Sequence, residues 1–245
     1  MRHQDKEING IGDLIKKLVA DVGSFEGPLW YRGQADASWK LEPKLLRLPE
    51  RKPETYYLNK FKQDASAMLN PQPKSEFDWL FLMQHHGAPT RLLDWTESPL
   101  VALYFAVCDN PSTDASLWVL LPTVLNIKSR YRPDYEFEVP SFEDEHLKQY
   151  SPSTIAQESK TKLFPMAAIA PRNSTRMQAQ RGVFTISHRE NIYVDEVGEA
   201  VGERDQSLRY IITPEIKIVI LKELSLLGIT RFQLFPDLES LTKNL

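Results

Sequence analysis

The sequence predicts a mixed α+β fold organised as a single domain. Helical and strand patterns are interspersed along the 245 residues, without the regular strand–helix alternation that indicates a parallel sheet. Hydrophobic residues make up 42% and charged residues 26% of the chain, which is the composition of an ordinary globular protein. A chain of this length buries about 70% of its unfolded surface, so one core suffices.

Apolar spacing and helix-end residues predict the elements of the first half. A helical stripe runs from Ile11 to Val19 and ends before Gly23, and Ser98 followed by Pro99 is typical of a helix start. A helix that is apolar on most sides, as the one after Ser98 is, belongs in a core. The predicted helices cover residues 11–21, 56–69, 77–86 and 98–106, and the predicted strands cover residues 29–33, 90–95 and 116–121.

The second half is less regular. Residues 126–162 are polar, charged and interrupted by prolines, which predicts an irregular insertion or flap. Alternating or β-branched runs predict strands over 182–187, 210–212 and 216–221, followed by helices over 222–227 and 229–245. Residues 1–24, with the first helix, are assigned to the same domain as the rest.

Composition excludes several classes of function. With 30 Lys and Arg against 33 Asp and Glu, the net charge of −3 argues against a protein that mainly coats nucleic acid or an anionic membrane. The single cysteine, Cys108, excludes an internal disulfide and a multi-cysteine metal site, and its apolar neighbours predict a buried free thiol. The sequence has no apolar run of signal-peptide or membrane-span length, so we expect a cytoplasmic protein without a membrane or disulfide partner.

The densest group of chemically useful side chains lies in residues 84–96. Imidazole, hydroxyl, guanidinium and carboxylate groups there stand between two apolar elements. A purely structural interpretation is also open, because polar groups beside a core need partners. In that interpretation Arg91 pairs with Asp94, Thr96 or Ser98 caps a helix, and His85 is a hydrogen-bonded core histidine. Adjacent histidines on a helix point in different directions, so they do not indicate a metal site.

Two further segments could contact a ligand. In residues 30–34, the guanidinium of Arg32 offers a fork for phosphate or carboxylate, and Gly33 lets a ligand approach the backbone. In residues 176–184, amides and arginines lead into a strand. The alternatives are an arginine paired with an internal acid in the first segment and a solvated strand entry, including Arg181, in the second.

These segments resemble the FRG domain family. The resemblance rests on Trp30-Tyr31-Arg32-Gly33-Gln34, with tyrosine in place of phenylalanine, on the long motif of residues 84–96 with the helix 98–106, and on residues 180–185. The ending Phe235-Pro236-Asp237-Leu238-Glu239 also fits, so the resemblance spans residues 25–240.

The order of these elements also resembles the ADP-ribosyltransferase fold. That resemblance implies a split β-sheet core with flanking helices, NAD as the substrate, and transfer of ADP-ribose to a macromolecule or to water. It implies that Arg32 binds phosphate, that His85 or Gln180 orients the ribose, and that Asp94 stabilises the reacting centre. The full implied set is His85, Asp94 and Gln180 for catalysis, and Tyr31, Arg32, Gly33, Gln34, Thr90, Arg91, Thr96, Arg176 and Gln178 for NAD binding.

One departure from that fold keeps a second function open. Gln178 and Gln180 stand where a catalytic glutamate is expected, and the nearest acid, Glu190, follows the strand. A glutamine accepts a ribose hydrogen bond but does not stabilise positive charge, which leaves Asp94 as the candidate for that role. The alternative is a non-catalytic module that binds a nucleotide or a protein. The resemblance further suggests a bacterial toxin or a phage-defence protein.

Overall fold

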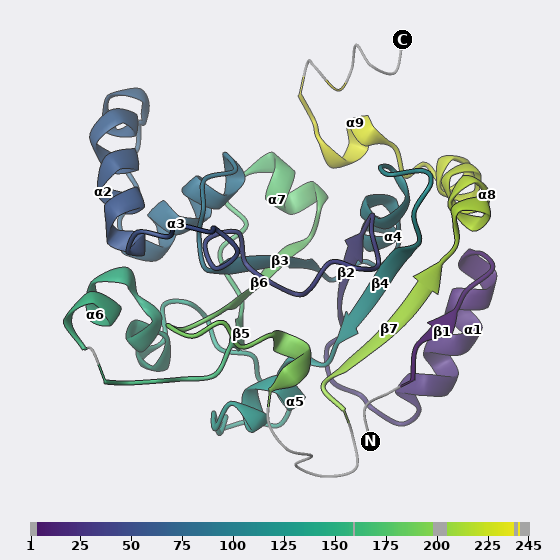
Figure 1. Ribbon diagram of the computed structural model, residues 1–245, viewed down its shortest axis with the longest axis horizontal. Coiled ribbons are helices and arrows are strands. Elements are labelled where there is room, and N and C mark those ends of the chain that lie inside the picture. Colours follow the sequence, from purple (N-terminus) through teal and green to yellow (C-terminus); the bar gives the residue numbers. More distant parts are fainter. Residues whose placement is uncertain (1–3, 159, 198–204, 238–239, 241–245) are drawn as a thin grey trace.

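One seven-stranded sheet organises the computed structural model, which describes residues 4–158, 160–197, 205–237 and 240 (Figure 1). The strand order is β1-β7-β4-β2-β3-β6-β5, and only the short β1 runs parallel to its neighbour. The strands are β1 (Lys6–Glu7), β2 (Trp30–Gln34), β3 (Leu92–Thr96), β4 (Ala115–Leu120), β5 (Met166–Ala168), β6 (Gly182–Ile186) and β7 (Ser207–Ile212). The predicted mixed α+β fold is confirmed.

The helices predicted in the first half are present. Ser98 caps α4 by accepting a hydrogen bond from the backbone nitrogen of Val101, with Pro99 at the first helical position. The helices are α1 (Ile11–Val22), α2 (Glu54–Ala65), α3 (Glu76–His85), α4 (Pro99–Val107), α5 (Pro122–Lys128), α6 (Pro152–Gln157), α7 (Thr175–Ala179), α8 (Pro214–Leu226) and α9 (Arg231–Leu234), with 3-10 turns η1 (Ser66–Met68), η2 (Glu145–Tyr150) and η3 (Val194–Glu196).

The predictions near the C-terminus are partly wrong. The strand over 216–221 and the separate helix over 222–227 are one helix, α8, which buries Lys217, Ile220 and Leu224 at helical spacing. A short β-branched run is ambiguous by periodicity alone, and packing against the sheet decides it. The helix predicted over 229–245 is present in part: α9 covers four residues, 235–237 are not helical, Ser240 is helical, and 238–239 and 241–245 lie outside the described residues.

The segment predicted as irregular is more ordered than expected. It contains the end of α5 together with η2 and α6. Of its described residues, 129–144, 151, 158 and 160–162 lack a helix or a strand, apart from one bridge between Ser141 and Ile169. Two short helices start at prolines after extended residues, Leu121 before α5 and Ser151 before α6. Pro152, one of the prolines that predicted irregular structure, therefore begins a helix.

Three apolar clusters hold the layers together. Helices α1, α4 and α8 pack on β2, β4 and β7 through one cluster, and α2 and α3 pack on β3, β5 and β6 through a second. Tyr31 of the first cluster is directly paired with Thr96. Thr96 lies on the same face of β3 as Leu92 of the second cluster, because alternate residues of a strand share a face, so both clusters lie on that face of the sheet. A third cluster, with Trp30, Trp95 and Leu125, covers the opposite face.

The sheet opens between its two halves. β2 is paired with β4, and β3 with β6, over five residues each, but β2 and β3 share the single pair Tyr31–Thr96. Gly33 stands beside this opening, where an added Cβ would lie 1.9 Å from the backbone oxygen of Ala102 in α4. The glycine is therefore required for the close crossing of α4 over β2, a reason that the sequence did not reveal.

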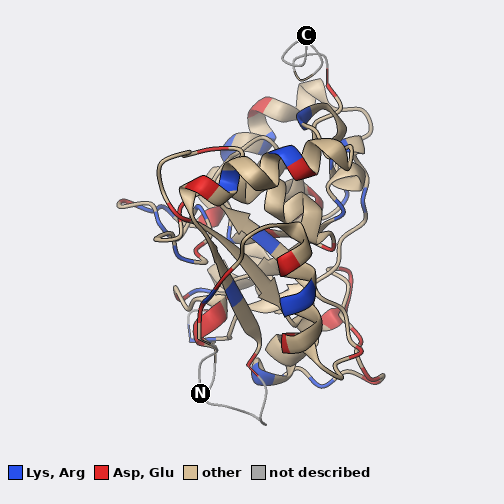
Figure 2. Ribbon diagram, turned by 90° about the vertical axis from the view of Figure 1, so that its right-hand side faces the viewer, with Lys and Arg blue, Asp and Glu red and all other residues tan. Residues whose placement is uncertain are grey.

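The outer surface carries charges of both signs. Figure 2, which views the side covered by α1 and α8, shows Lys and Arg interspersed with Asp and Glu. Among the described residues, no helix is long and apolar enough to cross a bilayer.

Candidate functional site

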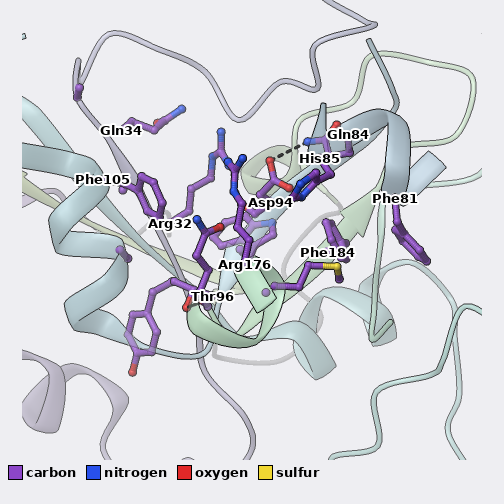
Figure 3. Close-up of a pocket in the computed structure, with 18 of the residues that line it drawn as sticks. Arg32, Gln34, Phe81, Gln84, His85, Asp94, Thr96, Phe105, Arg176 and Phe184 are labelled. Atoms are coloured by element: carbon purple, nitrogen blue, oxygen red, sulfur yellow. Dashed lines mark hydrogen bonds between the residues drawn. The ribbon is translucent and has the colours of Figure 1, made fainter. Parts of the chain in front are cut away.

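A cavity of about 320 Å³ lies at the opening between β2 and β3, walled by the end of α3, by α4 and by α7. Its size is that of a small-molecule site. Nine of the twelve residues predicted for the site line it, namely Tyr31, Arg32, Gly33, Gln34, His85, Asp94, Thr96, Arg176 and Gln180 (Figure 3). The other three, Thr90, Arg91 and Gln178, do not line this cavity.

Arg32 is a half-buried cation that forms no ion pair with any described residue. Its Nη1 donates to the backbone oxygen of Asp94 at 2.6 Å, and its Nε is buried without a hydrogen-bond partner. No carboxylate of the described part of the chain lies within 4 Å of this guanidinium. Burial lowers the pKa of Arg32, and the charge of Asp94 opposes that shift. An arginine in this state has donors free for an anionic ligand.

A hydrogen-bond relay orients Asp94. Its Oδ2 accepts from Nε2 of Gln84 at 2.7 Å, and the hydroxyl of Thr90 donates to Oε1 of Gln84 at 2.5 Å. Because the hydroxyl occupies the amide oxygen, the NH₂ group of Gln84 faces the carboxylate, and Oδ1 of Asp94 remains available. Thr90, predicted to bind ligand, instead acts through Gln84. Sequence reasoning missed Gln84, although it is the first residue of the long motif. A glutamine in a sequence carries no signal that distinguishes an amide that orients a carboxylate from one at the surface.

Basic and aromatic side chains complete the walls. Figure 3 shows Arg32, His85, Asp94 and Arg176 around the same space. Burial lowers the pKa of His85, and the charge of Arg176 lowers it further, which favours the neutral imidazole. The aromatic lining of Trp39, Phe81, Phe105 and Phe184 was also missed, since apolar residues in a sequence are equally consistent with core positions.

Several predicted residues use their polar groups inside the protein. The amide of Gln34 accepts from Nε1 of Trp118 at 2.8 Å, and the hydroxyl of Thr96 donates to the backbone oxygen of Gln180 at 2.6 Å. Gln180 in turn donates to the backbone oxygen of Leu234 at 3.1 Å. The exposed Gln178 donates to the backbone oxygen of Arg172, away from the cavity lining. These groups shape the cavity wall and join α7 to β3 and α9.

Arg91 belongs to a separate buried cluster, and the predicted pairing of Arg91 with Asp94 is wrong. Its Nε and Nη2 contact Oε2 of Glu54 at 2.8 and 2.6 Å, and further donors reach the backbone oxygens of Ser187 and Tyr150. Residues three apart along an extended segment point to opposite faces, which separates Arg91 from Asp94. The cluster joins α2, β3, β6 and η2.

Cys108 is partly buried at the end of α4, and its burial and the neighbouring Asp109 raise the pKa of the thiol to about 12. The thiol therefore stays protonated at pH 8, and we expect iodoacetamide to alkylate the folded protein at least about tenfold more slowly than the guanidinium-unfolded chain. Mass spectrometry of quenched samples measures both rates. Equal rates would contradict the buried, protonated state.

The described residues contain no group of three or more His, Cys, Asp or Glu side chains arranged to hold a metal ion. In the comparisons with known proteins, residues 27–115 match the FRG domain, a range that runs from before β2 to the start of β4 and includes Arg32, Gln84 and Asp94. No curated protein and no solved structure shows significant similarity to the chain. Residues 27–115 of the chain therefore belong to the FRG domain family.

Proposed function

We propose that the cavity between β2 and β3 binds NAD and that the protein is an ADP-ribosyltransferase-like enzyme, which releases nicotinamide and transfers ADP-ribose to a macromolecule or to water. The observation that carries this proposal is Arg32, whose guanidinium is half-buried in the cavity wall with a backbone oxygen as its hydrogen-bond partner and an unpartnered Nε. A desolvated arginine without a carboxylate is best explained by an anion that binds there, and the pyrophosphate of NAD is such an anion.

The open sheet supports the same proposal. A single residue pair joins β2 to β3, so the two halves of the sheet part where the cavity lies. This arrangement is in keeping with the split sheet that the resemblance to ADP-ribosyltransferases implies. The aromatic walls, with Phe105 on one side and Phe81 and Phe184 on the other, offer apolar surfaces to flat rings such as nicotinamide.

Asp94 has the charge and position for the chemical step. When the bond between the ribose and nicotinamide breaks, its electron pair leaves with nicotinamide, and positive charge develops on the anomeric carbon. A carboxylate held close to that carbon stabilises the charge. Gln84 holds Oδ2 of Asp94 and leaves Oδ1 to face this centre, while the acceptor, or water, supplies the new bond and loses a proton.

The test is to titrate the protein with NAD by calorimetry and to quantify nicotinamide release by chromatography, in the native protein and in Arg32→Met. We expect Arg32→Met to weaken NAD binding about tenfold or more, because the variant loses the charge and the donors that would meet the pyrophosphate. The variant should remain folded, since it orphans one carbonyl and no carboxylate, at a cost of about 1 kcal/mol.

The matched control is Arg132→Met, which removes an exposed arginine outside the cavity lining. Unchanged NAD affinity is expected in that variant. If the native protein neither binds NAD nor releases nicotinamide, or if Arg32→Met binds NAD as well as the native protein does, the proposal fails.

One observation favours a second function, a non-catalytic nucleotide-binding module. No glutamate is among the described residues that line the cavity, and the amide of Gln180 donates to the backbone oxygen of Leu234. Binding of NAD or ADP-ribose without nicotinamide release would assign the cavity to this module.

A further inference from the structure

A second cavity lies on a different part of the molecule. It has a volume of about 450 Å³ and is formed by the loop before α2, the start of α2, α6 and the residues after β6. It shares no lining residue with the candidate site, so an inference from it stands independently of the proposed function.

The lining of this second cavity carries an excess of positive charge. Its one carboxylate, Glu54, is fully engaged by Arg91 through the contacts given above. Three further cations, Arg51, Lys52 and Arg189, form no ion pair with a carboxylate of the described residues. Three cations around one concave surface repel one another, and an anion bound between them would relieve that repulsion.

Arg189 is the least exposed of these cations. Its Nη2 donates to the backbone oxygens of Ile155 and Glu158 at the end of α6, the latter at 2.5 Å, which holds the side chain in place. Its Nε is buried and has no hydrogen-bond partner. A buried donor without a partner costs about 1–3 kcal/mol, so a ligand that accepts from it would recover this energy.

The N-terminus of α2 also favours an anion in this cavity. This helix of twelve residues has Pro53 at its N-cap, which provides no side-chain hydrogen bond to the first turn, and Pro53 and Thr55 both line the cavity. The uncapped backbone donors and the positive end of the helix dipole add to the attraction for an anion.

Much of the remaining lining is aliphatic. Besides His188, the cavity is lined by the apolar side chains of Leu45, Leu46, Pro152, Ile155 and Ala156, which form an aliphatic wall. An inorganic ion would leave this surface in contact with water, whereas an apolar group of a ligand would cover it. We propose that the second cavity binds a small organic anion, in which a carboxylate or phosphate contacts Arg189, Arg51 and Lys52 and an apolar body covers the aliphatic wall.

The experiment compares three probes that share an aliphatic chain and differ in the charged group, namely octanoate, octyl phosphate and octylamine. Their binding to the full chain is measured by isothermal titration calorimetry. We expect the two anions to bind at one site and octylamine not to bind. Arg189→Met should weaken octanoate binding about tenfold or more. Because this substitution also removes contacts to α6, the double variant Arg51→Gln/Lys52→Gln, which changes exposed residues, provides the same test without risk to folding.

The matched control is Lys60→Gln/Lys74→Gln, which removes two exposed positive charges that do not line the cavity. Unchanged octanoate affinity is expected there, and the Arg51→Gln/Lys52→Gln variant should bind at least about threefold more weakly. The proposal is wrong if neither anion binds, if octylamine binds as well as octanoate, or if the Arg51→Gln/Lys52→Gln variant and its control bind alike. If octyl phosphate binds and octanoate does not, the ligand class narrows to phosphates.

Discussion

Replacing Asp94 by asparagine is expected to slow nicotinamide release by about 10²–10³-fold with little change in NAD affinity. The substitution keeps the shape of the side chain and an oxygen that can accept from Gln84, but it removes the negative charge that would face the anomeric carbon. A group that stabilises charge only in the transition state changes kcat rather than binding, and losses of this size are typical of such groups. Steady-state rates and calorimetric Kd values measure the two effects separately.

The control for this variant is Asp114→Asn. Asp114 is an exposed carboxylate just before β4 and does not line the cavity, so the change in net charge is the same. Its rate should match that of the native protein. If Asp94→Asn retains the native rate, Asp94 is not the stabilising carboxylate. A loss of binding without a change in kcat would assign it to ground-state recognition instead.

Replacing Arg91 by methionine is expected to lower the free energy of unfolding by about 3–5 kcal/mol. The substitution leaves the carboxylate of Glu54, whose side chain is 5% exposed, buried without its cation. It also removes donors from the backbone oxygens of Tyr150 and Ser187. Thermal denaturation should show a fall in Tm on the order of 10 °C. Arg32→Met should leave Tm nearly unchanged, although each of the two arginines stands in a motif of the same family.

The double variant Glu54→Met/Arg91→Met separates the two causes of destabilisation. With both charges removed, no buried ion is left unpaired, so this variant should be more stable than Arg91→Met alone. It should remain less stable than the native protein, because the backbone oxygens still lack their donors. Equal melting temperatures for the single and double variants would show that the lost carbonyl contacts, and not the orphaned carboxylate, dominate.

These two arginines show what residue type and spacing can predict about a site and what they cannot. Both were identified from the sequence as possible ligand contacts; Arg91 is buried, and Arg32 is half-buried with a buried Nε. Only the fold brings Glu54, which is 37 residues earlier in the chain, to Arg91, and brings the backbone oxygen of Asp94 to Arg32. Whether an arginine is structural or available to a ligand depends on which acid meets it, and that pairing is a long-range property.

The glutamines likewise show that residue type does not reveal a side chain's partner. The amides of Gln84 and Gln180 look alike in the sequence, yet one orients a carboxylate and the other joins α7 to α9. Local periodicity was enough for α1 and α4, where caps and apolar spacing agree. It failed for α8, because the five β-branched or apolar residues around Lys217 in the run 216–221 fit a strand or a buried helix equally well, and packing in one cluster with β7 and α4 distinguishes the two.

The sequence by itself determined the mixed α+β class, the C-cap of α1 at Gly23, the N-cap of α4 at Ser98, the family motifs and nine of the residues that line the cavity. It did so because capping, periodicity and motif chemistry are local properties of the chain. The tertiary structure alone decided that the sheet opens between β2 and β3, that no carboxylate of the described residues forms an ion pair with Arg32, and that Gly33 serves the crossing of α4. These features arise from contacts between segments far apart in the chain, whose partners no local pattern records.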